Sequence, residues 1–307
     1  MTGTGTQADP FVIGSWSDFI TAVGTSGAHV EFPKNLVSTS DTDVDANKLY
    51  VDSSGVVQTN VQPSDLANLY ENTFTLDANN YAPTGLASTI TINCASINGY
   101  GGTIKNLASS TAAIFKLNAT VSIEGLATLN FNVEDHNFIE QVWRGDYNHI
   151  TKCIFSGRIY SQSTYYFDRQ YYSRYLSCAF TVTLVGMGTG MFYEDSSNTA
   201  KLDACRVKVT KETSSSSNMH FTAKNTYITG SINQQLYLHT YSTDIYNVLD
   251  ISAPALYASN LMTNLANSDK CSNITNLISV TTEDLTNAET LAALGFPIQT
   301  WVSIWLG

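Results

Sequence analysis

A short apolar pattern recurs along the middle of the chain, and this repeat limits the folds that the chain can adopt more than any other feature. Its copies lie at Leu126, Leu129, Phe131 and Val133; at Ile150, Cys153 and Phe155; at Leu176, Cys178, Phe180 and Val182; and at Leu202, Cys205, Val207 and Val209, with weaker copies at Thr226, Ile228 and at Ile245, Val248. The second apolar position moves from 129 to 153, 178 and 205, in steps of 24, 25 and 27 residues. A repeat of this length is typical of one turn of a solenoid.

A second series of apolar runs lies between these copies. It comprises Ile114-Phe115, Phe138-Ile139, Phe167, Met191-Phe192, Met219-His220-Phe221 and Leu236-Tyr237-Leu238. Each turn therefore supplies at least two short strands, separated by clusters of Gly, Ser, Asn and Asp. Such short strands must stack on their neighbours at about 4.8 Å to pair their backbones and close a core. We predict an all-β, right-handed parallel β-helix, with Leu129, Cys153, Cys178 and Cys205 in one interior column.

The ends of a solenoid need caps, because an open coil exposes apolar side chains and unpaired strand edges. Residues 15–24 begin with Ser, carry Asp three residues later and end with Gly, which predicts a short capping helix. Residues 286–295 show the same logic at the other end. The expected organisation is an N-terminal arm and capping helix at 1–35, irregular first coils at 36–89, the β-helix at 90–280, and a C-terminal capping helix with an apolar tail at 281–307.

Charge and composition exclude several functions. The formal net charge of −11, with only 15 Lys and Arg, disfavours a nucleic-acid partner. No unbroken apolar run is long enough to span a membrane, and the first residues lack the pattern of a secretion signal, so we expect synthesis in the cytoplasm. The five cysteines show no C-x-x-C pair and the histidines no metal-binding spacing, so we expect free thiols, no metal and no cofactor.

A polysaccharide hydrolase would need two carboxyl groups across a groove. Asp146, Asp168 and Glu194 are spaced about one coil apart, so they are the candidates for such a pair. A lyase would need clustered Asp with Arg, as in Arg144-Gly145-Asp146 and Asp168-Arg169. However, Asp also favours the turns between coils, and surface ion pairs explain the Arg residues equally well. We therefore favour a protein without catalytic residues and keep the depolymerase as the alternative.

Aromatic residues give better support for a binding or interface role. The candidates are Trp143, Tyr160, Tyr165, Tyr166, Tyr171, Tyr172, Tyr175 and Tyr193, together with Trp301 and Trp305 in the apolar tail. Strand alternation cannot bury Tyr165 and Tyr166 alike, so some of these rings must face outward. Exposed aromatic rings stack on sugars and also cement subunit interfaces. The sequence leaves both uses open.

Three stretches carry a family resemblance: 3–13, the Gly-rich turn and strand at 97–107, and the end at 291–298. They resemble the corresponding parts of a pectin-lyase-like β-helix group common in phages of Gram-positive and gut bacteria. The resemblance implies a virion component, such as a capsid decoration, a fibre or a tail appendage, docked on other virion proteins. It also implies a homotrimer, includes a receptor-binding protein among the roles, and supplies no catalytic residue. Contact with host-surface carbohydrate is an expectation that rests on the aromatic residues.

Overall fold

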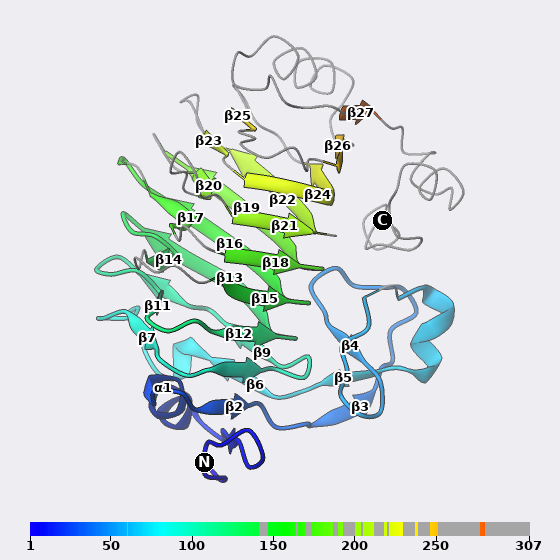
Figure 1. The fold of residues 1–307 in the computed structure, drawn as a ribbon, viewed down its shortest axis with the longest axis vertical. Helices are drawn as coiled ribbons and strands as arrows, with labels where there is room; N and C mark the ends of the chain where they lie inside the picture. The colour runs from blue at the N-terminus through cyan, green and yellow to red at the C-terminus, as the bar shows by residue number, and fades with distance from the viewer. Residues whose placement is uncertain are drawn as a thin grey trace.

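The computed structural model describes residues 1–59, 61–140, 147–163, 165–169, 173–186, 190–192, 200–203 and 205–211, and the backbone of strands at 218–219, 221–229, 237–238, 246–250 and 277–279. In this part of the chain, parallel strands stack coil upon coil as a right-handed parallel β-helix (Figure 1). The coils follow one another from the N-terminal end, drawn in blue, through cyan and green to yellow. The predicted all-β fold class is confirmed.

Three columns of strands run along the helix. The first contains β2 (His29–Glu31), β8 (Ser96–Asn98), β12 (Ser122–Glu124), β15 (Asn148–Thr151), β18 (Ser173–Leu176), β21 (Ala200–Asp203) and the start of β24 (Phe221–Thr229). The second contains β6 (Thr75–Asp77), β9 (Thr103–Lys105), β13 (Ala127–Glu134), β16 (Ile154–Tyr160), β19 (Ala179–Val185), β22 (Arg206–Lys211) and the end of β24. β1 (Phe11–Val12) pairs with β2, and β10 (Ala108–Ser109) pairs with β13.

The third column confirms the second series of apolar runs. It contains β7 (Ile90–Ile92), β11 (Phe115–Leu117), β14 (Ile139–Glu140), β17 (Tyr166–Asp168) and β20 (Gly190–Phe192). Parallel pairing continues where β23 (Asn218–Met219) pairs with β25 (Tyr237–Leu238). β24 also pairs with β26 (Tyr246–Asp250), and β26 pairs with β27 (Leu277–Ser279).

The corner between the first two columns is built from residues with left-handed backbone. Gly125, Lys152 and Ser177 have φ of 65°, 52° and 52°, and they occupy the same place in successive coils. The amide of Gly125 donates to the carbonyl of Thr151, and the amides of Lys152 and Ser177 donate in the same way to the coil above. A single left-handed residue therefore turns the chain while its amide stays paired.

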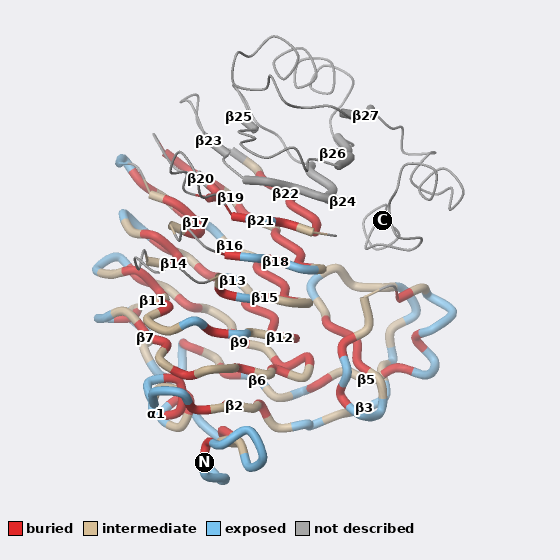
Figure 2. Tube along the Cα trace, in the orientation of Figure 1, coloured by how far each residue is buried: buried red, intermediate tan, exposed pale blue. Residues whose placement is uncertain are grey.

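Apolar side chains fill the interior of the coils. The buried residues are drawn red along the trace in Figure 2. Phe138 stacks on Phe167 with ring centroids 4.9 Å apart, and Phe155 stacks on Phe180 at 5.4 Å. Cys94, Cys153, Cys178 and Cys205 are buried free thiols. Cys153, Cys178 and Cys205 directly precede Ile154, Ala179 and Arg206, which are paired in register on β16, β19 and β22, so the predicted cysteine column is confirmed. Cys271 lies outside the described residues.

Two leucines of the predicted pattern, Leu129 and Leu176, do not lie where the sequence repeat placed them. Leu129 pairs with Ser156 and faces outward, and Leu126 takes the interior position below Cys153. A bulge at Asn130, with φ of 55°, shifts the register of β13 and separates Leu129 from the interior column. Leu176 is 46% exposed, because the neighbouring residue Tyr175 points inward instead.

The N-terminal capping helix is confirmed as α1 (Trp16–Gly24). Ser15 is the N-cap, and its Oγ accepts a hydrogen bond from the amide of Asp18 at 3.2 Å. The side chains of Trp16, Phe19 and Val23 are buried against the first coil. The indole N–H of Trp16 also donates to the carbonyl of Asp77 at 2.8 Å. The predicted helix at 286–295 and the apolar tail lie outside the described residues.

Residues 36–72 differ from the irregular first coil that the sequence predicts. They form a small antiparallel sheet of β3 (Leu36–Ser38), β5 (Tyr70–Asn72) and β4 (Tyr50–Val51), with a 3-10 helix, η1 (Pro63–Asn68), between β4 and β5. This side sheet is inserted between β2 and β6 and lies beside the coils (Figure 1). A second 3-10 helix, η2 (Ala78–Asn80), follows β6, and the parallel pairing resumes there.

The side sheet covers an apolar patch on the outer face of the second column. Its side chains Leu49, Val51 and Val57 form one buried cluster with Ala127, Ile154 and Ala179 of the coils. Apolar residues at these outward positions would otherwise face water, so burial by the insert explains why they are apolar.

Candidate functional site on the outer face of the coils

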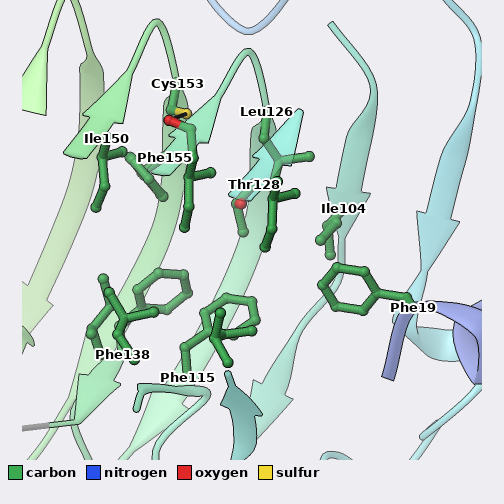
Figure 3. Close-up of a pocket in the computed structure, with 14 residues that line it drawn as sticks. Phe19, Ile104, Phe115, Leu126, Thr128, Phe138, Ile150, Cys153 and Phe155 are labelled. Carbon is green, nitrogen blue, oxygen red and sulfur yellow. Dashed lines mark hydrogen bonds between the residues drawn. The ribbon is translucent and has the colours of Figure 1, made fainter. Parts of the chain in front are cut away.

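One cavity in the interior of the described coils is small and apolar. It has a volume of about 30 Å³ and is lined by side chains such as Phe115, Phe138, Ile150 and Phe155, which point toward one another in Figure 3. Thr128 brings the one hydroxyl to this lining. Such a space is a packing defect between coils, because a dry apolar cavity offers too few polar partners to hold water or a polar ligand.

Asp168, one of the three predicted carboxylates, lies inside the helix. It ends β17 and is completely buried, and its Oδ2 accepts a hydrogen bond from the hydroxyl of Tyr175 at 2.6 Å. Burial, and next the charge of Asp168, raise the pKa of Tyr175 well above its ordinary value. This carboxylate is positioned to link the third strand column to the first, and a polysaccharide on the surface could not reach it. Asp146 and Glu194 lie outside the described residues.

The predicted aromatic residues divide among different environments. Tyr175 is in the core and Tyr166 is buried, whereas Tyr160 and Tyr165 are half-buried at the end of β16 and the start of β17. Tyr165 is thus more exposed than Tyr166, but β17 itself does not alternate, since Tyr166, Phe167 and Asp168 are all buried. The Tyr160 hydroxyl accepts a hydrogen bond from Gln162 at 2.7 Å. The other predicted aromatic residues, Trp143, Tyr171, Tyr172, Tyr193, Trp301 and Trp305, lie outside the described residues.

A cluster on the outer face of the first column was not among the predicted site residues. His149, Arg174 and Lys201 occupy the same position on β15, β18 and β21, in direct register, and all three are exposed. The guanidinium of Arg174 lies 4.4 Å from the ring centroid of Tyr147, and the Lys201 ammonium lies 4.9 Å from the same centroid. We call His149, Arg174 and Lys201 the cationic column.

The cationic column could have been found from the sequence. The three residues are 25 and 27 apart, as are Cys153, Cys178 and Cys205, and each lies four residues before the corresponding cysteine. The distance of four residues from a cysteine does not by itself show that these side chains face outward. A corner residue with left-handed backbone lies between them and the cysteine and interrupts the strand alternation. Once the corner at Lys152 and Ser177 is known, strand alternation assigns the outward direction.

A second charged cluster belongs to the side sheet. Lys48 Nζ lies 2.8 Å from Asp41 Oδ2 and 3.0 Å from Glu71 Oε2, and the Tyr50 hydroxyl donates to Asp41. Hydrogen bonds from Lys48 and Tyr50 lower the pKa of Asp41. Each charge in this cluster has a partner of opposite sign, which is typical of a structural network rather than a binding site.

Neither a metal centre nor a membrane helix is present in the part of the chain that the structure describes. No group of three or more His, Cys, Asp or Glu side chains there is arranged to hold a metal ion. None of the helices in the same part is long and apolar enough to cross a membrane.

Comparison with known proteins adds nothing to the description of this chain. The sequence matches no family model, and neither the curated proteins nor the solved structures contain a match. The protein is therefore defined here by its architecture, a right-handed parallel β-helix with an inserted antiparallel side sheet.

Proposed function

We propose that this β-helix is a non-enzymatic structural protein of a bacteriophage particle, such as a capsid decoration, a fibre or a tail appendage. The proposal rests on the resemblance of the stretches at 3–13, 97–107 and 291–298 to phage β-helix proteins, and on the parallel coils that agree with it. In this role the protein docks on other virion proteins as a homotrimer and presents its outer faces to the host surface.

The observation that favours a structural role over catalysis is the burial of Asp168. A glycosidase needs both carboxyl groups at the sugar, one on each side of the scissile bond. Asp168 is enclosed between coils and bonded to Tyr175, so its carboxylate serves the core. A pair made with Asp168 is therefore disfavoured, and the alternative of a polysaccharide depolymerase would have to rest on other carboxylates.

The half-buried tyrosines support a role in surface contact. Tyr160 at the end of β16 and Tyr165 just before β17 are only half-buried, so part of each side chain is open to solvent. Amphipathic rings of this kind serve subunit interfaces and sugar contacts alike. Both uses are compatible with a component on the outside of a particle.

The direct test is to locate the protein in intact particles. Density maps of particles with and without the protein should differ by an elongated β-helical feature at a fixed site on the virion. Particles whose density and mass-spectrometric composition lack the protein would overturn the proposal.

A second measurement addresses catalysis. Purified protein incubated with isolated host capsule should release neither reducing ends nor unsaturated sugars, and the D146N/E194Q variant should behave like the unmodified protein. Sugar release that is lost in this variant would establish the depolymerase alternative instead.

A further inference from the structure

The cationic column is a concentration of like charge on a chain that is otherwise acidic. His149, Arg174 and Lys201 lie on three adjacent strands, so they span about 10 Å at the usual strand spacing of about 4.8 Å. Like charges directly opposite one another on neighbouring strands destabilise a sheet. Arg174 and Lys201 are in this arrangement, in a protein with a formal net charge of −11.

Among the described residues, no carboxylate forms an ion pair with Arg174 or Lys201. Lys48, Lys105 and Lys152 each form an ion pair with an Asp or a Glu, whereas the interactions described for Arg174 and Lys201 are with the ring of Tyr147. Asp203 is on the same face, two residues beyond Lys201, without forming an ion pair with it among the described contacts. The ring of Tyr147 offsets part of the repulsion and leaves both charges open to an anion.

The shape of the column indicates what kind of anion it fits. Arg174 and Lys201 are cations on adjacent coils, and the imidazole of His149 occupies the same position on the coil before them. These groups repeat along the helix axis at the strand spacing, which is close to the length of one sugar in an extended polysaccharide. A chain with a carboxylate or sulfate on successive sugars could therefore place one anionic group at each coil. The Tyr147 ring is already contacted by two cations, so the contact depends on charge and hydrogen bonds rather than on stacking of sugar on this ring.

We propose that the cationic column binds an anionic polysaccharide that lies along the helix axis, with Arg174 and Lys201 as the main contacts. This inference deepens the proposed surface-contact role and rests on it. A nucleic acid is disfavoured as the occupant, because its closely spaced phosphates are bound by larger clusters of Lys and Arg, and the net charge of −11 opposes it.

The test compares two charge-matched double variants of the full chain. R174Q/K201Q removes the two main contacts, and R158Q/K208Q removes one Arg and one Lys that are exposed on the outer face of the second column. Binding is measured by biolayer interferometry to polygalacturonate and to dextran sulfate, which carry anionic groups on successive sugars, and to neutral dextran and duplex DNA as control surfaces. Circular dichroism and thermal unfolding check that both variants keep the fold.

The unmodified protein should bind at least one of the two anionic glycans, more weakly as salt is raised, and should not bind neutral dextran. R174Q/K201Q should lose about tenfold or more in affinity, while R158Q/K208Q should stay within about twofold. Equal losses in the two variants, binding to neutral dextran, or DNA binding as tight as glycan binding would each overturn the inference.

The two proposals fail in different ways. Absence of glycan binding by folded protein overturns this inference, and the density test for the virion role is independent of that result. Absence of the protein from particles overturns the virion role, even if the soluble protein binds an anionic glycan through Arg174 and Lys201.

Discussion

The hydroxyl of Tyr175 donates a hydrogen bond to the carboxylate of Asp168 at 2.6 Å, and both side chains are buried inside the coils. Tyr175 lies in the first strand column and Asp168 in the third, seven residues earlier in the chain. The bond therefore joins two sides of the helix where one coil passes into the next. It gives a buried carboxylate a donor, without which the cost of burial would be large.

Removing this donor should destabilise the protein. We expect Y175F to lower the free energy of unfolding by about 1–3 kcal/mol, because Asp168 loses one of its hydrogen-bond donors in the core. Y160F is the matched control, since the Tyr160 hydroxyl is bonded to Gln162 at an exposed site, and its effect should be about 0.5 kcal/mol or less. Urea unfolding measures both, and equal effects would show that the Tyr175 bond has no special role.

The cysteine part of the interior column could be predicted from the sequence, because the same residue type recurs once in each turn. Cys153, Cys178 and Cys205 are small, apolar and regularly spaced, so stacking them required no knowledge of the corners. The capping helix could also be predicted, because Ser15 and Asp18 give a local signal that needs no distant partner. Local and strictly periodic features are thus the ones that a single sequence reveals.

Features that depend on local irregularity could not be predicted. The bulge at Asn130 moves Leu129 to the outer face, and a pattern of apolar residues contains no sign of it. Asp168 looks like a turn residue or a surface acid until its partner Tyr175 is known to point inward. The antiparallel side sheet lacks the 25-residue repeat, and only the apolar patch that it buries explains its position.

A glycine in the turn after β19 should tolerate no side chain. Gly186 has φ of 99°, and a Cβ at this position would lie 1.8 Å from the carbonyl oxygen of Ser161 in the coil below. We expect G186A to destabilise the protein by about 2 kcal/mol or more, through strain and displacement of the turn. G24A is the matched control, because a Cβ at the end of α1 meets no atom within 4 Å.

Thermal unfolding distinguishes the two glycine variants. G24A should unfold at the same temperature as the unmodified protein or slightly above it, because alanine favours the helix more than glycine by up to about 1 kcal/mol. A G186A protein with unchanged stability would mean that the close approach to Ser161 does not exist.

Stability should fall at alkaline pH. Burial raises the pKa of Cys94 to about 12, and it also raises the pKa of Cys178 and of Tyr175. In the unfolded chain these groups lose their protons near pH 8.5 for Cys and 10 for Tyr, as a rough guide. Above those values the folded protein holds more protons than the unfolded chain, so the free energy of unfolding decreases as pH rises.

The contribution of these groups is therefore complete below about pH 8.5 and is lost progressively above it. The urea midpoint should be level around neutral pH and should decline through pH 9 to 11. Y175F should decline less steeply above pH 10, because one of the groups that drive the loss is gone. A midpoint that rises, or stays level, across this alkaline range would contradict the burial of these groups.

The register of the coils is the relationship on which the core, the corners and the cationic column all depend. Ser122 of β12 and His149 of β15 are exposed and directly opposite each other, 27 residues apart in the chain, whereas Glu124 lies diagonally from His149. Neighbouring strands bring directly opposite Cα atoms within disulfide range, about 4.4–6.8 Å, and place diagonal pairs at about 7–8 Å.

Mild oxidation of two double-cysteine variants, followed by mass spectrometry of the linked peptides, measures this register directly. The S122C/H149C variant should form the disulfide between positions 122 and 149 nearly completely in the folded protein, and E124C/H149C should form its disulfide slowly or not at all. Preferential cross-linking in E124C/H149C, or no cross-link in either folded variant, would contradict the stacked coils described here.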